Sequence, residues 1–431
     1  IYPKKYFFYI GISWVVLTVL CKFISPIMNI VFLIFFVYAM MLLYAVIKYN
    51  KKILHEFSAY IIIGIILFTG FYMRWNALIF YEGIKLEYDA EDYYNISIKY
   101  SKGLFDTAAE RPPYIREPFY IWILKCGFLF FPKTPEALRI IALIISLISI
   151  YSTFLFGKKY LGYLTGLGTS AYMSVSESFI NAGVQGLRED LYLCILILFL
   201  YQLIKKEKKM SFGITIGISA GLLMLVRITA FSFIIPLIFI FSVIHRWKPI
   251  NIVISLIVPF TMVIPHLIFN YNFMDSKDIL YSGNIHTSFY RNYEFAGKPG
   301  FITREEFKTD PYHGGNISAF KYLFFEHSPV QIISGFTKGT IRIYLTSFTY
   351  DTLLNKNNIL LVIYIIGIIG LIFSNQRWIF LIWFFISFPM LYLSSFVIVE
   401  RLLLYLIPFQ LYGIFAGWIK VSDYGKRFFR K

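Results

Sequence analysis

The sequence has little of what a soluble or disulfide-stabilised protein needs. Only 3 of its 431 residues are cysteines, and only 15% are charged. Scattered cysteines without a paired spacing exclude a disulfide framework and a zinc site as the basis of the fold. A charged fraction this low, beside 58% hydrophobic residues, excludes an ordinary soluble domain. The chain is therefore predicted to lie in a lipid bilayer.

Acidic residues are scarce as well, with 24 Asp and Glu against 41 Lys and Arg and a net charge of +17. Such a charge could indicate a nucleic-acid-binding protein, but the cations come in short clusters between apolar runs and form no single basic face. Membrane topology explains them better, because cytoplasmic loops of membrane proteins are rich in Lys and Arg. No nucleic-acid partner is predicted.

Apolar runs long enough to cross a hydrocarbon core of about 30 Å, at 1.5 Å per residue, occur about twelve times. They lie at residues 6–24, 27–47, 57–79, 136–156, 161–180, 189–204, 211–226, 229–245, 250–270, 358–374, 378–397 and 401–419. With both termini in the cytoplasm, about twelve spans put every cationic cluster on the cytoplasmic side, Lys158 and Lys159 among them. The predicted fold class is an all-α polytopic membrane protein with about 12 transmembrane helices.

Two connections are long and predicted to be non-cytoplasmic, residues 80–135 and 271–357. In the first, the segment 118–131 is apolar but too short for a span, so it is predicted to be a helix lying along the interface. In the second, the part around 282–300 is predicted to be extended, and 319–350 has the apolar periodicity of a helix lying on the membrane. We expect the chemistry in these two loops.

The chain is predicted to form a single membrane-embedded domain, 1–431. Its predicted parts are two N-terminal spans (1–56), a transmembrane core (57–270) that includes the first outer loop, the second outer loop (271–357), three C-terminal spans (358–419) and a cytoplasmic tail (420–431). The composition, rich in Ile, Lys and Asn, indicates a bacterial inner or plasma membrane.

An acidic run follows the third predicted span: Tyr88-Asp89-Ala90-Glu91-Asp92-Tyr93-Tyr94. Later in the same loop comes the run Arg116-Glu117-Pro118-Phe119-Tyr120. Carboxylates at an interface, between a low-dielectric wall and cations, can have shifted pKa values and can position a catalytic base. The alternative is a water-facing loop with no catalytic role, because charge runs are usually solvated.

Several motifs, taken in order, resemble the GT-C type of integral-membrane glycosyltransferase, in particular the protein-mannosyltransferase-like family 39. The family has an acidic D-A-x-x-Y motif after a span, an R-E-P-x-Y element on an interfacial helix, and further short motifs at the ends of later spans. The matching residues here are Asp89-Ala90 with Tyr93 and Gly103, Arg116 to Tyr120, Ala137-Leu138-Arg139, Gly157-Lys158-Lys159 with Gly162, Gly186 to Asp190, Gly221 to Arg227, and Glu400-Arg401 with Tyr405 to Pro408. Their order and spacing agree with the topology derived above.

The resemblance implies a GT-C fold and the transfer of a hexosyl or pentosyl group from a polyprenyl-phosphate donor. The acceptor would be a glycan, a lipid or a protein on the outer membrane face, and the anomeric carbon would be inverted. Asp89 is the candidate general base, and Asp92 in the same motif is the alternative. The expected partners are the donor, the acceptor and membrane lipids.

Cations near the non-cytoplasmic face are the candidates to bind the donor phosphate. They are Arg116, Arg188, Arg227, Lys338 and Arg401. An arginine at the end of a span can instead snorkel to the headgroups, and that alternative stays open for each.

The candidates for acceptor or sugar binding are Tyr93, Glu117 and Tyr120. No metal site is predicted from histidine spacing. The resemblance leaves open a divalent cation, Mg²⁺ or Mn²⁺, at the acidic motif.

Two other functions remain as alternatives to the glycosyltransferase hypothesis. A flippase or transporter of lipid-linked oligosaccharides would need charged residues inside its spans, and Arg74, Lys125 and His266 are the main candidates. A polymerase or ligase of envelope polysaccharide would place its key groups in the late loop, where Arg291 and His327 lie.

Overall fold

The described part of the chain is helical apart from one antiparallel hairpin. The computed structural model describes residues 53–98, 105–110, 113–205, 210–273, 281–313, 321–322, 325–335, 337–338, 367, 369–374, 376, 378–387 and 404–428. The predicted spans 6–24 and 27–47 therefore lie outside the described residues, as do the whole of 388–403 and Arg401 within it. The helical content confirms the predicted all-α class in outline.

Within the described residues, 5 helices are long and apolar enough to cross a membrane. Their segments are Ala59–Phe80 in α3 (Ile53–Phe80), α6 (Pro135–Tyr160), Ile228–His245 in η2 (Ile228–Ala230) and α11 (Phe231–His245), Pro249–Asn272 in α12 (Pro249–Phe273), and Leu404–Val421, which includes most of α20 (Ile407–Phe428). Each coincides with a span predicted from the sequence. The protein is thus a polytopic membrane protein, and the full number of about 12 spans stays a prediction.

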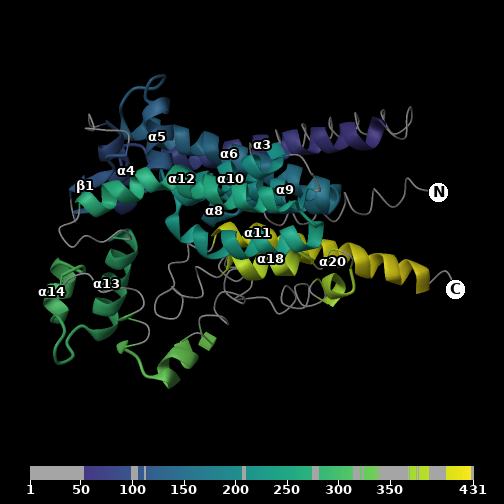
Figure 1. The fold of residues 1–431 in the computed structure, drawn as a ribbon. Coiled ribbons are helices and arrows are strands. Elements are labelled where there is room, and N and C mark those ends of the chain that lie inside the picture. Colours follow the sequence, from purple (N-terminus) through teal and green to yellow (C-terminus); the bar gives the residue numbers. More distant parts are fainter. Residues whose placement is uncertain are drawn as a thin grey trace.

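Two shorter apolar helices also occupy predicted spans: α9 (Glu189–Ile204) and α10 (Met210–Val226). Their leucines and phenylalanines pack with α6 and α11 in one continuous apolar core. In Figure 1 these helices form an elongated bundle, with α11, α18 (Trp378–Ile386) and α20 along its lower side.

The predicted span 161–180 is instead two helices, α7 (Tyr163–Val175) and α8 (Glu177–Val184), separated at Ser176. The fully buried guanidinium of Arg74 in α3 donates hydrogen bonds to carbonyl oxygens on both sides of the break, to Met173 at 3.1 Å and to Phe179 at 3.3 Å. Met173 lies in the last turn of α7, where carbonyls have no partner within the helix, so a buried donor there stabilises the break. Arg74 therefore has a structural role and does not indicate a translocation path.

The first outer loop builds a compact layer at one end of the bundle. It contains α4 (Tyr88–Ile98), the strands β1 (Ala108–Glu110) and β2 (Pro113–Ile115), and α5 (Pro118–Gly127). The strands pair antiparallel, with Ala108 opposite Ile115. Helix α5 begins with a proline, which suits the first turn because no helical partner exists there for an N–H group. It occupies most of the segment predicted as an interfacial helix, and its place at the membrane surface stays a prediction.

The second outer loop differs from its prediction at one point. The segment expected to be extended contains the helix α13 (Tyr281–Phe295), followed by the short α14 (Arg304–Thr309). Ser, Gly and Asn residues in α13 have low helix propensity, but its buried Tyr290 and Phe295 pack against Tyr322. Tertiary packing thus overrides local propensity. Figure 1 shows α13 and α14 beside the end of the bundle where α4 and β1 lie.

Candidate active site

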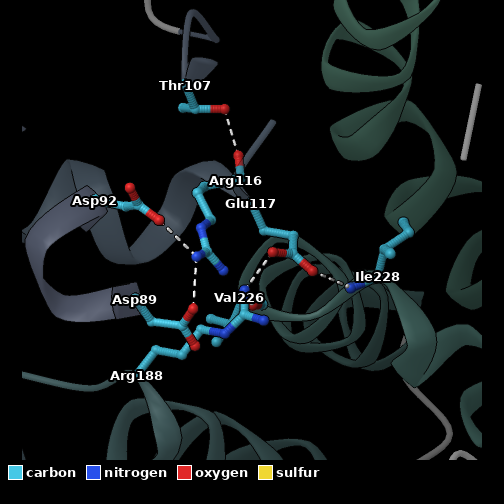
Figure 2. A network of polar contacts seen from close by, with 8 residues as sticks. All are labelled: Asp89, Asp92, Thr107, Arg116, Glu117, Arg188, Val226 and Ile228. Carbon is cyan, nitrogen blue, oxygen red and sulfur yellow. Dashed lines mark hydrogen bonds and ion pairs between the residues drawn. The ribbon is translucent and has the colours of Figure 1, made fainter. Parts of the chain in front are cut away.

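A cluster of charged side chains begins at the first turn of α4. Asp89 and Asp92 are three residues apart on one face of the helix, and acidic residues in a first turn interact favourably with the helix dipole. Arg116 Nη2 donates to Asp89 Oδ1 at 2.5 Å and to Asp92 Oδ2 at 2.7 Å. A single guanidinium therefore bridges both carboxylates, as Figure 2 shows.

The hairpin holds Arg116 in place through its backbone. The Arg116 N–H donates to the Thr107 carbonyl oxygen at 2.9 Å, and the Thr107 hydroxyl donates to the Arg116 carbonyl oxygen. These bonds extend the pairing of β1 and β2 by one step beyond Ile115. Arg116 is consequently fixed and buried, and its side chain reaches back to α4.

The next residue, Glu117, forms a second ion pair. Its backbone is extended, so successive side chains point to opposite sides, and Glu117 faces away from α4. Arg188 donates to its Oε2 through Nη1, which also donates to the Val226 carbonyl oxygen at 3.0 Å. The Ile228 N–H approaches the other Glu117 oxygen at 3.4 Å. Glu117 thereby joins the start of α5, the residue before α9 and the break after α10.

Tyr93 lies between the two ion pairs. Its ring is 5.3 Å from the Arg116 guanidinium carbon and 5.9 Å from that of Arg188, distances at which a cation is attracted to an aromatic face. Tyr120 packs edge-on against it with ring centroids 5.0 Å apart. Tyr120 is 0% exposed and its hydroxyl donates to the Gly186 carbonyl oxygen at 3.0 Å. Such burial fits a positioning role for Tyr120 better than contact with an acceptor.

The burial of the cluster separates two kinds of group. The side chains of Asp89 and Asp92 are 22% and 15% exposed, whereas those of Arg116, Arg188 and Glu117 are 7%, 10% and 8% exposed. The two aspartates are thus the charged groups that an incoming hydroxyl can reach most easily. The arginines and Glu117 form the layer behind them.

The electrostatics follow from this burial. Burial by itself would raise the pKa of Glu117, but the charge and hydrogen bond of Arg188 outweigh it and lower the pKa to about 2. Burial raises the pKa of Asp92, and the hydrogen bond from Arg116 partly offsets the rise. Burial also raises the pKa of Tyr93 to about 12. Glu117 is therefore a permanent anion at neutral pH, and Asp92 is a stronger base than an ordinary aspartate.

The other predicted cations fall in different places. Arg227 is buried one residue before Ile228, so it adjoins the cluster, and its guanidinium carbon lies 5.2 Å from the Tyr192 ring centroid. Lys338 is exposed and makes no contact with the cluster among the described residues. Arg401 lies outside the described residues, so its predicted role is untested.

Three contributors were not singled out for the site from the sequence: Thr107, Tyr192 and His266. Thr107 forms hydrogen bonds with the backbone of Arg116, and the Tyr192 ring contacts the Arg227 guanidinium. His266 of α12 is buried and close enough to Glu117 to interact with its charge. None belongs to a recognisable local pattern, and only the packing of α9 and α12 around the outer loop brings the last two to the cluster.

The late-loop groups proposed for a polymerase form a separate cluster. His327 is buried, with Nε2 2.9 Å from a Glu294 carboxylate oxygen and Nδ1 2.8 Å from the Tyr322 carbonyl oxygen. The Tyr322 hydroxyl donates to the same Glu294 oxygen at 2.7 Å. These bonds tie α13 to the segment after it, so His327 has a structural explanation within the loop.

One family model matches part of the chain. Residues 111–269 match the family model described as dolichyl-phosphate-mannose-protein mannosyltransferase. The matched segment includes Arg116, Glu117, Arg188 and Arg227, and it begins after the acidic helix α4. No curated protein matches the chain significantly. The family match confirms the resemblance that the motifs predicted, to integral-membrane glycosyltransferases of GT-C type.

Proposed function

We propose that this glycosyltransferase moves a sugar from a polyprenyl-phosphate donor to a hydroxyl of a glycan, lipid or protein acceptor, with inversion at the anomeric carbon. The observation that carries the proposal is the bridge from Arg116 to both Asp89 and Asp92 at the accessible edge of a buried charged cluster. Arg116 lies inside the segment that matches the mannosyltransferase family, and the two aspartates precede that segment.

Asp89 is proposed as the general base. A base must first reach the proton that it removes, and only then does its pKa matter. Asp89 is the more exposed of the two carboxylates, at 22% against 15%. Arg116 orients the Asp89 side chain through an ion pair, and the same Nη2 atom also contacts Asp92. Asp92 remains the alternative base, since burial raises its pKa.

The proposed reaction needs one proton transfer and one substitution. Asp89 accepts the proton of the acceptor hydroxyl while that oxygen forms a bond to the anomeric carbon. The bond between this carbon and the phosphate oxygen breaks on the opposite face, which inverts the configuration. The bonding electrons leave with the polyprenyl phosphate, which is already a good leaving group. A single base can therefore suffice, because no acid is needed to protonate the leaving oxygen.

Arg188 and Arg227 are proposed to stabilise the charge that grows on the departing phosphate. Both are buried, and Arg188 contacts the break between α10 and η2 directly. A guanidinium can bind phosphate oxygens through two parallel N–H groups, which favours arginine over lysine at such a site. The Tyr93 ring contacts both Arg116 and Arg188, so the predicted anion site and the base belong to one cluster.

A divalent cation at the acidic motif fits these side chains poorly. Magnesium and manganese prefer carboxylate oxygens, and Asp89 and Asp92 offer two of them. Arg116 Nη2, however, lies within 2.7 Å of an oxygen on each. Among the described residues, no group of three or more His, Cys, Asp or Glu side chains could hold a metal ion. We therefore assign the neutralisation of this pair to Arg116.

The outer membrane face is proposed from the distribution of charge. The cluster lies at the start of α9, and the lysine-rich connection 205–209 follows the end of the same helix. Cationic loops mark the cytoplasmic side, so the cluster would face outward. By the same rule both termini are proposed to be cytoplasmic.

The direct test is sugar transfer from a panel of polyprenyl-phosphate donors. The full chain, purified in detergent, is incubated with radiolabelled hexosyl and pentosyl donors and with glycan, lipid and peptide acceptors. We expect one donor to be consumed with release of polyprenyl phosphate and with an inverted product by nuclear magnetic resonance. Consumption of no donor by a monodisperse protein, or retention of configuration, would contradict the proposal.

Chelation tests the assignment of Arg116. We expect EDTA to change the transfer rate by less than about twofold, because the guanidinium already neutralises both carboxylates. The measurement compares initial rates with EDTA alone and with EDTA plus excess Mg²⁺ or Mn²⁺. A loss of activity that either ion restores would show that a metal shares the acidic motif.

A further inference from the structure

A groove opens between α6 and α9 at the end of the bundle away from the charged cluster. Its volume is about 520 Å³. The lining side chains include Ser152, Leu155 and Lys159 on α6 and Cys194, Leu198 and Gln202 on α9. On both helices they recur every three or four residues, so the groove follows the helix axes. From Cys194 to Gln202 it spans about 12 Å at 1.5 Å per residue.

The groove is apolar along most of its length and polar at one end, called the mouth below. The part beside Ser152 and Leu198 lies within the apolar stretches of α6 and α9, whereas the lysines and Gln202 lie near the helix ends. A groove of this kind matches an amphiphile, with a hydrocarbon chain along the helices and a polar group at the mouth. The cations at the mouth require that polar group to be negative.

Lys158 is held in position at the mouth. Its Nζ donates to the Tyr60 hydroxyl at 2.8 Å and lies 4.3 Å and 4.9 Å from the ring centroids of Tyr60 and Tyr163. The ammonium also forms a side-chain hydrogen bond with Tyr163. An ammonium has three donors, so these two bonds leave one donor for an anion. Lys159, the next residue along the chain, is exposed. The mouth thus combines one oriented cation, Lys158, and one solvent-exposed cation, Lys159.

We propose that this groove binds an anionic phospholipid of the cytoplasmic leaflet, with its phosphate at Lys158 and Lys159 and one acyl chain between α6 and α9. The positive-inside rule predicts this end of the bundle to be cytoplasmic, where anionic lipids and basic residues attract each other. The site lies near the opposite end of α9 from the residues assigned to sugar transfer. It is therefore independent of the proposed reaction.

The segment 1–52 is the other candidate to cover the groove, because it contains two predicted spans and precedes Tyr60 along the chain. Its charges argue against it. No Asp or Glu occurs before Glu56, so this segment would bring only Lys residues to the two lysines at the mouth. Like charges in a low-dielectric setting repel. An anionic headgroup matches the mouth, and the N-terminal segment does not.

Lipid binding can be counted by native mass spectrometry of the purified full chain in equimolar phosphatidylglycerol and phosphatidylcholine. We expect the wild type to retain phosphatidylglycerol in preference. Lys158→Gln/Lys159→Gln should weaken this binding about 25-fold, because each lysine near an anionic headgroup contributes about fivefold. Lys158→Arg/Lys159→Arg should keep it. The matched control, Arg246→Gln/Lys248→Gln, removes two cations from the same predicted face outside the groove and should have little effect.

A second variant fills the groove without changing its charge. Leu198 is 43% exposed, so Leu198→Trp is tolerated sterically and should displace the lipid. Equal binding of both lipids by the wild type, or equal losses in the groove and control variants, would overturn the proposal. So would a photo-crosslinker in place of Leu198 that captures residues 1–52 instead of phospholipid.

Discussion

Asp89→Asn is expected to lower kcat for sugar transfer by about 10²- to 10⁴-fold, the usual contribution of a positioned general base. The amide has nearly the same shape as the carboxylate and can still accept a hydrogen bond from Arg116, so the fold and donor binding should survive. The measurement is kcat and KM at saturating donor, with monodisperse elution as the check on folding. A folded variant with near wild-type kcat would remove Asp89 from the role of base.

Two neighbouring substitutions give this test its controls. Glu91→Gln changes a carboxylate on the exposed side of the same helix and should leave kcat within about twofold, since surface charges contribute little. Asp92→Asn should lower kcat less than Asp89→Asn. The reverse order would assign the base to Asp92. In that case the activity would be lost at a higher pH, on acidification, than for an enzyme whose base is an aspartate of ordinary pKa. The reason is that burial raises the pKa of Asp92 and only the ionised carboxylate can accept a proton.

Arg188→Met is expected to have the largest effect on stability, a loss of about 3–5 kcal/mol in the free energy of unfolding. The substitution leaves Glu117 with a side chain that is 8% exposed and without its guanidinium partner. Because Arg188 holds the pKa of Glu117 down at about 2, its removal also takes away the reason for that side chain to stay ionised. Unfolding in mixed micelles with increasing SDS measures the change.

The double variant Glu117→Gln/Arg188→Met separates stability from catalysis. Removing both charges avoids an unpaired buried ion, so much of the lost stability should return. Transfer activity should not return, because the proposed contact of Arg188 with the leaving phosphate is still missing, a loss of about 10²- to 10³-fold by analogy with other preorganised donors. A double variant with wild-type activity would make Arg188 a purely structural residue. Unchanged stability in the single variant would mean that water reaches Glu117.

Much of the architecture could be predicted from the chain alone. The five described helices that can cross a membrane coincide with predicted spans, because long apolar runs have few stable alternatives in a bilayer. The failures fall where periodicity is ambiguous. The run 161–180 is predicted from the sequence to be one span, yet it breaks at Ser176, next to the charged Glu177. There the buried Arg74 of α3 donates to carbonyl oxygens on both sides of the break, contacts that the sequence of the run could not reveal.

The candidate site, too, could be predicted from the sequence only in part. The sequence by itself determined that acidic residues follow a span, that an R-E-P element comes later in the same loop, and that single arginines stand at the starts and ends of later spans. Those are properties of order and spacing. It could not determine which charges pair with each other. No local sequence pattern indicates that Arg116 pairs with Asp89 and Asp92 while Glu117 pairs with Arg188.

Only the tertiary structure decided those pairings, and the physical reason is burial. A guanidinium or carboxylate withdrawn from water must find an opposite charge or a backbone partner, and which one it finds depends on the elements packed around it. Here the hairpin fixes Arg116 against α4, and the break after α10 presents the Val226 carbonyl and the Ile228 N–H to the Arg188 and Glu117 pair. The sequence determined which charges exist near the membrane, and packing decided which of them stay accessible to a substrate.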